Sequence, residues 1–473
     1  MNVPAGTGLY RTTYDRNAVA TGIVHAGFGA FHRGHQAVYL DDYMQATGDL
    51  RWGIAAVNLR AADSASFAAM ASVQDGYLLK TMAPDGGQAM RLVRSHAAYA
   101  DWAANREAAE SLLERESVHA LSMTVTESGY YLASDWTLNT SDPVIAGEIA
   151  GKPARSIYAF LANALARRAE RLDQPITVLC CDNIRANGRV LERAFLSYLD
   201  ATGHRDLADW VENHASFPCS MVDRITPRAT AELADEVEQL FPGESLAPIH
   251  AETFTQWVIE DRFAGPMPDL GKCGVQIVDD VHPFEEAKIR ILNGGHTGLA
   301  YLGALAGHRT FDQAMADPDL RAHFDLWQRA EVLPGLTLSL PFDKGAYLAE
   351  IAARFGNAAI ADQLERICMD GYSKMPIYVR PTLEACLAQG ISPRHGYRCI
   401  ASWYVFARRS ADGACRIPYI EPYWDSLKPL LANGQETAFA SAPQLWADLP
   451  ERFPDFVPGV VAAMQEMERQ WPV

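Results

Sequence analysis

Four polar side chains with complementary chemistry lie close together in the middle of the chain: Glu285, Lys288, Asn293 and His296. The surrounding residues predict a helix that begins near Pro283. Proline suits the first helical turn, and the helix dipole stabilises acidic residues there. On an α-helix each residue advances by about 100°, so the four side chains would fall within an arc of roughly 140°. We therefore expect one helical face to present a carboxylate, an amine, an amide and an imidazole.

This combination suits the oxidation of an alcohol without a metal ion. A lysine can act as a general base once burial or a cationic neighbour lowers its pKa, and carboxamides can stabilise an alkoxide as it forms. The structural alternative is that Lys288 forms a surface ion pair with Glu285, while His296 is a hydrogen-bonded histidine of the core. The segment alone leaves both interpretations open.

Two consecutive glycines, Gly294 and Gly295, interrupt the same predicted helix. Each costs about 1 kcal/mol relative to alanine in a helix interior. Some group must therefore approach the backbone closely at this point, and a bound ligand would be one such group.

The composition indicates a folded protein whose ligand is a small molecule. The chain has 473 residues, of which 49% are hydrophobic and 21% charged, which is typical of a folded protein with two domains. Its net charge of −17 disfavours nucleic acid and anionic membranes as partners. The eight cysteines follow neither a disulfide nor a zinc-site pattern, and we find neither a leader nor a long apolar segment. We expect reduced thiols, no bound metal, no membrane partner and a cytoplasmic location.

A glycine-rich turn near the N-terminus indicates a dinucleotide site. An apolar strand runs into Gly27-Phe-Gly29, and we expect an amphipathic helix to follow through Met44. Such a turn lets a pyrophosphate approach the backbone. The signal is weak by itself, because His32 stands where the usual fingerprint has its third glycine.

A second apolar strand, at residues 52–59, precedes the acidic residue Asp63. In NAD enzymes of the doubly wound fold an acid after the second strand binds a ribose hydroxyl. Asp63 lies farther along the chain than the usual spacing, so capping of a helix is an alternative role.

Two further apolar strands, at residues 120–126 and 176–181, complete the pattern of a doubly wound parallel sheet. The first leads to Glu127, and the second leads to a polar turn with Asn183 and Asn187. Polar residues at the carboxyl ends of such strands face the ligand crevice, so both asparagines are site candidates, although we expect one of them to serve the turn. Asp223 follows another short apolar stretch and by itself says little.

From about residue 280 the pattern changes to helical periodicity. We predict an α/β, Rossmann-type domain with insertions over residues 1–280 and a mostly α-helical domain over residues 281–473. Helices are expected at residues 284–305, 318–330, 347–355, 359–370 and 382–388, and an exposed loop at residues 434–442. Arg366 and Lys374 flank a loop in this domain, where Arg366 by itself is more typical of a solvated cation at a helix end than of a ligand.

Together these segments resemble the polyol-specific long-chain dehydrogenases of the mannitol dehydrogenase family. The resemblance spans nearly the whole chain and rests on ordered motifs: Gly27-Phe28-Gly29-Ala-Phe31-His32-Arg33-Gly-His-Gln, Thr126-Glu127-Ser-Gly-Tyr, Cys181-Asp-Asn183-Ile-Arg-Ala-Asn-Gly, Met221-Val-Asp223-Arg-Ile-Thr-Pro, Lys288-x4-Asn293-x2-His296 and Gly371-Tyr-Ser-Lys374-Met-Pro. It implies an N-terminal Rossmann domain, a mostly helical C-terminal domain and a site between them. It also implies metal-independent oxidation of a secondary alcohol of a sugar polyol with NAD or NADP, by a protein that is expected to be a monomer.

The resemblance further implies a role for each matching residue. Lys288 would be the general base, Asn183 and Asn293 would stabilise the alkoxide, and Glu285 would assist the release of the proton. Substrate hydroxyls would be held by Asp223, His296, Arg366 and Lys374. The cofactor would contact Gly27, Phe28, Gly29, Phe31, His32 and Arg33, together with Asp63 and Glu127.

Several points about the substrate and cofactor stay open. Ala62 stands where some NAD-preferring relatives have a second acid, so discrimination against NADP would be weaker, and Ser128 replaces a common glycine. Within the family, arabinitol 4-dehydrogenases are most similar and mannitol 2-dehydrogenases follow. Fructuronate and tagaturonate reductases share the same catalytic group, and a cation near the substrate could bind their carboxylate.

Other classes receive less support from the sequence. No tyrosine has a lysine four residues later, as the short-chain dehydrogenases require, and the cysteine and histidine spacings do not suit catalytic zinc. A nucleotide-binding sensor without catalysis is the alternative from a different class. It would be expected to have lost part of the Lys288, Asn293 and His296 group, which is complete here.

Overall fold

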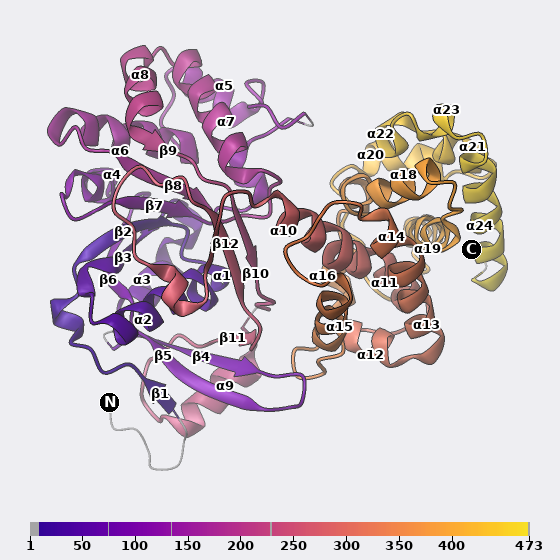
Figure 1. Cartoon of the computed structure of the whole chain (residues 1–473), viewed down its shortest axis with the longest axis horizontal. Coiled ribbons are helices and arrows are strands. Elements are labelled where there is room, and N and C mark those ends of the chain that lie inside the picture. The colour runs from indigo at the N-terminus through magenta and orange to yellow at the C-terminus, as the bar shows by residue number, and fades with distance from the viewer. Residues whose placement is uncertain (1–8, 74, 134, 228, 472–473) are drawn as a thin grey trace. The chain divides into compact units, whose positions relative to one another are not determined.

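The structure is a computed structural model, and it describes residues 9–73, 75–133, 135–227 and 229–471. The chain forms two compact units (Figure 1). Unit 1 comprises Met1–Ala83 with Gly87–His282, and unit 2 comprises Pro283–Val473 with Pro84–Gly86. Within the described residues, no helix combines the length and the apolar character that crossing a membrane would require.

Unit 1 is built on a parallel sheet of six strands. In spatial order these are β6 (His96–Asp101), β3 (Gly53–Asn58), β2 (Thr21–Ala26), β7 (Ala120–Met123), β8 (Ile176–Cys180) and β9 (Ala215–Ser216). If these six strands are renumbered along the chain, the order is 3-2-1-4-5-6, which is the order of the Rossmann fold. The doubly wound α/β prediction is therefore confirmed.

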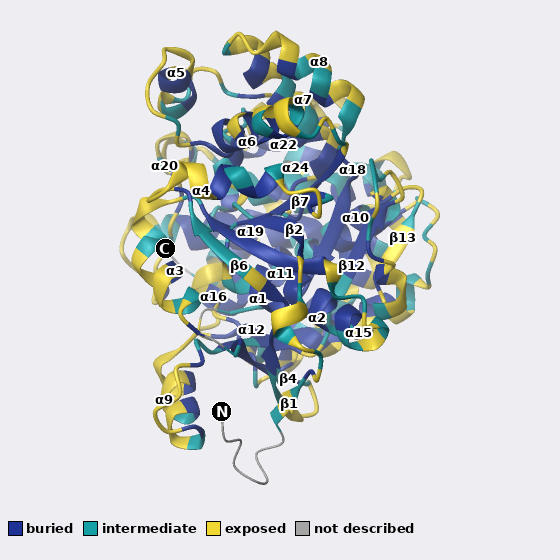
Figure 2. Ribbon diagram, turned by 90° about the vertical axis from the view of Figure 1, so that its left-hand side faces the viewer, coloured by how far each residue is buried: buried dark blue, intermediate teal, exposed yellow. Residues whose placement is uncertain are grey.

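The four central strands of this sheet, β3, β2, β7 and β8, are buried on both faces, and β2 and β7 are dark blue in Figure 2, whereas the edge strands β6 and β9 are partly exposed. Alternate residues of β2 point to opposite faces, so Val24 packs in the core with α6 (Ile157–Arg171) and α7 (Asn187–Ala201). Ile23 packs in the other core, with α2 (Gln36–Thr47). Burial on both faces explains why the strands read as continuous apolar runs in the sequence.

Two smaller sheets of unit 1 were not predicted. One contains β1 (Leu9–Arg11), β5 (Gln88–Val93), β4 (Tyr77–Met82) and β11 (Ile249–Glu252), and the other contains β10 (Ser220–Asp223), β12 (Gln256–Glu260) and β13 (Gln276–Val278). β11 pairs with β4 although a long stretch of chain separates them, and such long-range pairing leaves little local signal. The other helices of unit 1 are α1 (Ala30–Gly34), α3 (Ser64–Ala71), α4 (Arg106–Glu110), α5 (Pro143–Ile149), α8 (Arg205–His214) and α9 (Ala231–Leu240).

The single amphipathic helix expected after Gly29 is wrong, because α1 and α2 are separate helices that meet at His35. His35 has φ −128° and ψ −91°, which is not helical. The carbonyl oxygen of Gly34 accepts a hydrogen bond from Arg224, and His35 Nε2 lies 2.8 Å from the carbonyl oxygen of Gln256. Contacts with distant segments therefore break the helix, and α2 itself is buried on most of its surface.

Unit 2 is helical, which confirms the prediction for this part of the chain. Its α-helices are α10 (His282–Ala287, which begins at the last residue of unit 1), α11 (Gly294–Leu305), α12 (Phe311–Ala316), α13 (Pro318–Leu326), α14 (Leu333–Gly335), α15 (Lys344–Phe355), α16 (Leu364–Ile367), α17 (Gly371–Lys374), α18 (Arg380–Ala388), α19 (Arg394–Ala411), α20 (Trp424–Leu427), α21 (Glu436–Ala440), α22 (Pro443–Trp446), α23 (Leu449–Arg452) and α24 (Phe456–Gln470). The core of the unit is formed around α19, which packs against α11 and α24.

Three predictions about unit 2 are corrected. Residues 359–363 are not helical, because Gln363 bridges to Thr310 and the carbonyl oxygen of Asp362 accepts from the Phe311 amide at 2.9 Å. Residues 436–440 form α21 rather than an exposed loop, with Phe439 fully buried. The α-helices expected at residues 284–305 and 318–330 each contain a π-helical segment, Lys288–Asn293 and Trp327–Val332, and a further π-helical segment among the described residues is Met375–Val379.

Candidate active site

Lys288 and Asn293 are the first and last residues of a π-helical turn between α10 and α11. Because π-helical hydrogen bonds join residues five apart, these two residues are separated by roughly 50° around the axis, instead of about 140° on an α-helix. His296 follows three residues later on α11, close to the same direction. The continuous α-helix expected here is therefore wrong, because residues 288–293 are π-helical. Lys288, Asn293 and His296 still share one face, and the arc that they span is smaller than on an α-helix. Such single π-turns occur frequently at functional sites.

The surface position considered for Lys288 and Glu285 is not observed. Lys288 is 8% exposed and Glu285 is 6% exposed. An amine and a carboxylate in such a position are desolvated, which is how proteins adapt these groups for proton transfer.

His296 is not a fully hydrogen-bonded core histidine either. Its ring stacks on Phe355, with centroids 4.7 Å apart, and meets the edge of Phe311. Its Nε2 atom is buried and has no hydrogen-bond partner among the described residues. Burial lowers the pKa of His296 to about 3, so the imidazole is neutral near neutral pH. A neutral, unpartnered Nε2 is suited to bind a hydroxyl group.

The close approach to the backbone that the two glycines of this helix predict is confirmed, and the approaching groups belong to unit 2 itself. A Cβ atom on Gly295 would lie 2.4 Å from Gln328 Nε2, and one on Gly294 would lie 2.9 Å from the Tyr378 carbonyl oxygen. Gln328 Nε2 in turn donates to the carbonyl oxygen of Ile291 at 2.9 Å, and Trp327 Nε1 donates to that of Gly294 at 3.3 Å. Buried side chains thus support the π-turn from outside.

Arg366 is paired with Asp362, a residue that the sequence analysis did not single out. Arg366 Nε donates to Asp362 Oδ1 at 3.0 Å, and an Arg366 Nη2 group donates to Oδ2. The same Oδ2 atom lies 3.8 Å from His296 Nε2. Arg366 does lie in the last turn of α16, and its side chain is 57% exposed, as the helix-end interpretation expects, but it is also held by the ion pair with Asp362. The spacing of four residues between acid and arginine was the available signal, but it is common on helices.

Lys374 is the second predicted substrate cation of unit 2. Its ammonium group donates to the carbonyl oxygen of Ile367 at 2.9 Å. Burial lowers the pKa of Lys374, and Asp370 opposes that shift. The side chain is thus fixed near the end of α16, on which Arg366 also lies.

The two asparagines after β8 have different roles. Asn187 is buried. Its Nδ2 group donates to the carbonyl oxygens of Cys180, Asp182 and Ser220, and its Oδ1 atom accepts from the Ser220 amide. Asn183 lies exposed in the turn. Asn187 is therefore the asparagine that serves the structure, and Asn183 remains the candidate for the site.

Asp182 joins the ends of β7 and β8. It accepts hydrogen bonds from the amides of Val125 and Thr126 and from the Tyr130 hydroxyl, the last at 2.7 Å. Burial raises the pKa of Asp182 to about 6. These contacts fix the stretch that carries the exposed Glu127 beside the turn that carries Asn183.

The glycine-rich turn is shaped partly by packing and partly by open space. Gly27 has φ +103°, and a Cβ atom there would lie 2.2 Å from the Thr124 carbonyl oxygen. Nothing lies within 4 Å of the Cβ position of Gly29, so its backbone is accessible.

The aromatic and basic residues of this motif are mostly directed inward. Phe28, His32 and Arg33 are all less than 9% exposed. His32 stacks on His25 with centroids 3.4 Å apart, and Phe31 stacks on His35. Their side chains therefore pack within unit 1, which leaves the backbone as the accessible part of the motif.

Asp63 pairs with Arg60 at the end of β3, with Asp63 Oδ2 2.6 Å from Arg60 Nε. Its side chain makes no hydrogen bond that caps α3, although it occupies the N-cap position. The capping alternative is therefore not observed. Asp223, the last residue of β10, is 5% exposed.

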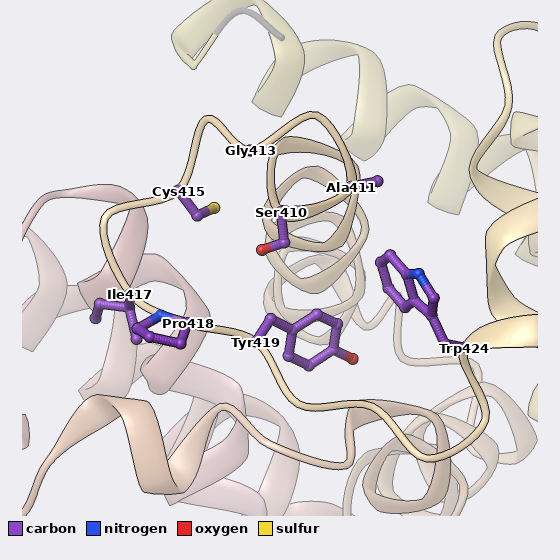
Figure 3. Close-up of a pocket in the computed structure, with 8 residues that line it drawn as sticks. All are labelled: Ser410, Ala411, Gly413, Cys415, Ile417, Pro418, Tyr419 and Trp424. Atoms are coloured by element: carbon purple, nitrogen blue, oxygen red, sulfur yellow. The ribbon is translucent and has the colours of Figure 1, made fainter.

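A cavity of about 270 Å³ lies elsewhere in unit 2, at the end of α19 (Figure 3). Its lining includes Ser410, Cys415, Tyr419 and Trp424, and none of the predicted site residues. Among the described residues, no group of three or more His, Cys, Asp or Glu side chains is arranged to hold a metal ion. All eight cysteines are free, and six are buried.

Comparison with known proteins agrees with the fold and the motifs. The sequence profile of the mannitol dehydrogenase Rossmann domain matches residues 21–272, and that of the mannitol dehydrogenase C-terminal domain matches residues 280–468. A D-arabinitol 4-dehydrogenase from Ralstonia nicotianae is 36% identical over 91% of this chain and 93% of its own length. A D-mannonate oxidoreductase from Escherichia coli is 32% identical over 98% and 97%. The solved ternary complex of Pseudomonas fluorescens mannitol 2-dehydrogenase with NAD and D-mannitol has a TM-score of 0.87 and 30% identity, and covers 98% of this chain and 95% of that one.

Proposed function

The chain belongs to the mannitol dehydrogenase family, and from that premise we propose that it is an NAD-dependent enzyme that oxidises one secondary alcohol of a sugar polyol to a ketone. The substrate would be a C5 or C6 polyol such as arabinitol, mannitol or sorbitol. The observation that carries the proposal is the buried Lys288, which shares the narrow face of a π-turn with Asn293.

Lys288 would act as the general base of the reaction. Oxidation of an alcohol removes a proton from oxygen and a hydride from the adjacent carbon, so a base must accept the proton as the carbonyl forms. A buried amine that is neutral when substrate binds can do this. Glu285, three residues earlier on the same face, would then accept the proton and pass it on.

Amide and imidazole groups would stabilise and orient the substrate oxygen. The side-chain amides of Asn293 and Asn183 can donate to the oxygen as negative charge develops on it. The Nε2 atom of His296 has no hydrogen-bond partner in the described part of the chain and would bind a neighbouring hydroxyl. Arg366 and Lys374 would hold hydroxyls farther along the polyol, and Asp223 would accept from another.

Unit 1 has features that fit a dinucleotide. The backbone at Gly29 is open, and the acid Asp63 stands after the second strand of a Rossmann sheet. NAD, when bound, supplies the hydride acceptor. The exposed Glu127 and the turn at Asn183 lie at the carboxyl ends of β7 and β8, where ligands of such sheets bind.

The test is the reduction of NAD by a panel of polyols. The purified protein would be mixed with NAD, a metal chelator and, in turn, arabinitol, mannitol, sorbitol and xylitol, and NADH would be followed by absorbance. Turnover of one polyol in the presence of chelator supports the proposal. Binding of NAD without turnover of any polyol or hexuronate would contradict it and favour a sensor.

A further inference from the structure

The acid Asp362 holds the candidate substrate cation Arg366 in a two-pronged ion pair. Arg366 Nε and one Nη group meet the two oxygens of the carboxylate, the arrangement in which arginine and carboxylate bind most strongly. Asp362 is itself fixed, because its carbonyl oxygen accepts from the Phe311 amide and the next residue bridges to Thr310. The side chain of Asp362 is 7% exposed, whereas that of Arg366 is 57% exposed.

This pairing leaves Arg366 able to donate hydrogen bonds, but the negative charge of Asp362 compensates its positive charge. Its second Nη group has no partner within the described part of the chain, so it can still donate to a hydroxyl. A carboxylate at the same place would face Asp362 directly behind the guanidinium. The substrate carboxylate and the Asp362 carboxylate would then repel each other, and the repulsion is stronger where the two groups are partly removed from water.

The other groups near Asp362 add little free positive charge. His296, whose Nε2 lies 3.8 Å from Asp362 Oδ2, is neutral. Lys374 donates to a backbone carbonyl oxygen and faces two acids, Asp370 and Glu421. Arg354, a third cation that faces His296, is 3% exposed and is not free of partners.

We propose that Asp362 is a specificity-determining residue, which neutralises Arg366 and thereby selects uncharged polyols and ketoses over sugar acids. This inference rests on the proposed function and narrows its substrate class. It accounts for a choice that the catalytic group alone does not make, because Lys288, Asn293 and His296 act on the secondary alcohol whether or not the substrate also has a carboxylate.

The test compares the reduction of a neutral ketose with that of the matching ketohexuronate. NADH oxidation would be measured with fructose and with fructuronate, for the wild-type protein, for Asp362→Asn and for the double variant Asp362→Asn/Arg366→Gln. We expect the wild type to prefer fructose by about tenfold or more in kcat/KM. Asp362→Asn should lower that preference by about tenfold, mainly through a lower KM for fructuronate, because Arg366 then has an uncompensated charge.

The double variant is the matched control, because it removes both charges and should restore the preference for fructose. A purely structural role of Asp362 would lower both activities together and leave the ratio unchanged, which would overturn the inference. Equal efficiency of the wild-type protein with both substrates would overturn it without any variant, so the test does not depend on the folding of Asp362→Asn. If the wild type reduces neither substrate and oxidises no polyol, the proposed function fails instead.

Discussion

The side-chain amide of Gln328 donates to the carbonyl oxygen of Ile291 over 2.9 Å, from one π-helical segment of unit 2 to another. The acceptor lies inside the turn that carries Lys288 and Asn293. A π-turn disturbs the regular pattern of backbone hydrogen bonds, and side chains that bond its carbonyl oxygens stabilise it. The geometry of the candidate base is thus supported by a residue that does not belong to the catalytic motif.

Replacing Gln328 by leucine should weaken both the fold and the reaction. The variant removes a buried hydrogen bond, which we expect to lower the free energy of unfolding by about 1 kcal/mol. It should also lower kcat more than it changes KM, because the π-turn sets the position of Lys288. Denaturant unfolding and steady-state kinetics measure the two effects.

The matched control for this prediction is Gln389→Leu. Gln389 also donates to a backbone carbonyl oxygen, that of Ala385 at 3.0 Å, but it is exposed. Its replacement should change the unfolding free energy by less than about 0.5 kcal/mol. If Gln328→Leu behaves like this control in both assays, Gln328 does not support the turn.

Asp63 should determine the preference for NAD over NADP together with its partner Arg60. Asp63→Ala removes the acid that would bind the ribose hydroxyl and frees Arg60, which could then pair with the 2′-phosphate of NADP. We expect the ratio of kcat/KM for NAD to that for NADP to fall by about tenfold or more. Arg60→Ala is the control and should not favour NADP. An unchanged ratio in Asp63→Ala would show that Asp63 does not contact the ribose.

Buried histidines should make the protein sensitive to acid. Burial lowers the pKa values of His25, His296 and His323 to about 3, from an ordinary value of 6.5. Each folded-state pKa lies below the unfolded value, so the stabilisation is complete above about pH 6.5 and is lost as the pH falls towards 3, because the unfolded chain binds protons first. The melting temperature should therefore decrease steadily from pH 7 to pH 4.

A pair of substitutions tests the origin of this acid sensitivity. His323→Gln removes one buried group that must stay neutral, so its melting temperature should fall less between pH 7 and pH 4 than that of the wild type. His204→Gln removes an exposed histidine and should leave the pH dependence unchanged. Equal slopes for all three proteins would show that His323 is not responsible.

The parts of the fold that have a local signal could be predicted from the sequence, and those made by distant contacts could not. The buried strands of the parallel sheet appear as apolar runs, and the Lys288 group appears as a periodic pattern. The break at His35 depends on Arg224 and Gln256, which are far away in the sequence. The end of the predicted helix at residues 359–363 depends on Thr310 in the same way.

The candidate site shows the same division. Asn183 and Asn187 have the same turn chemistry, and only the hydrogen bonds of Asn187 to Cys180 and Ser220 separate their roles. Asp362 lies in a stretch that was predicted as an ordinary helix, so its link to His296 has no signature in the sequence. The π-turn likewise depends on Gln328, which comes from another helix.

Removal of the Lys288 amine tests its role as the general base. NADH formation would be measured for the wild type, for Lys288→Ala and for the exposed-lysine control Lys428→Ala, with whichever polyol the wild type oxidises, and NAD binding would be measured by calorimetry. We predict that Lys288→Ala lowers kcat by about a thousandfold or more and leaves the affinity for NAD unchanged, while Lys428→Ala behaves as the wild type. A Lys288→Ala protein that folds, binds NAD and oxidises the polyol at near the wild-type rate would show that Lys288 is not the general base.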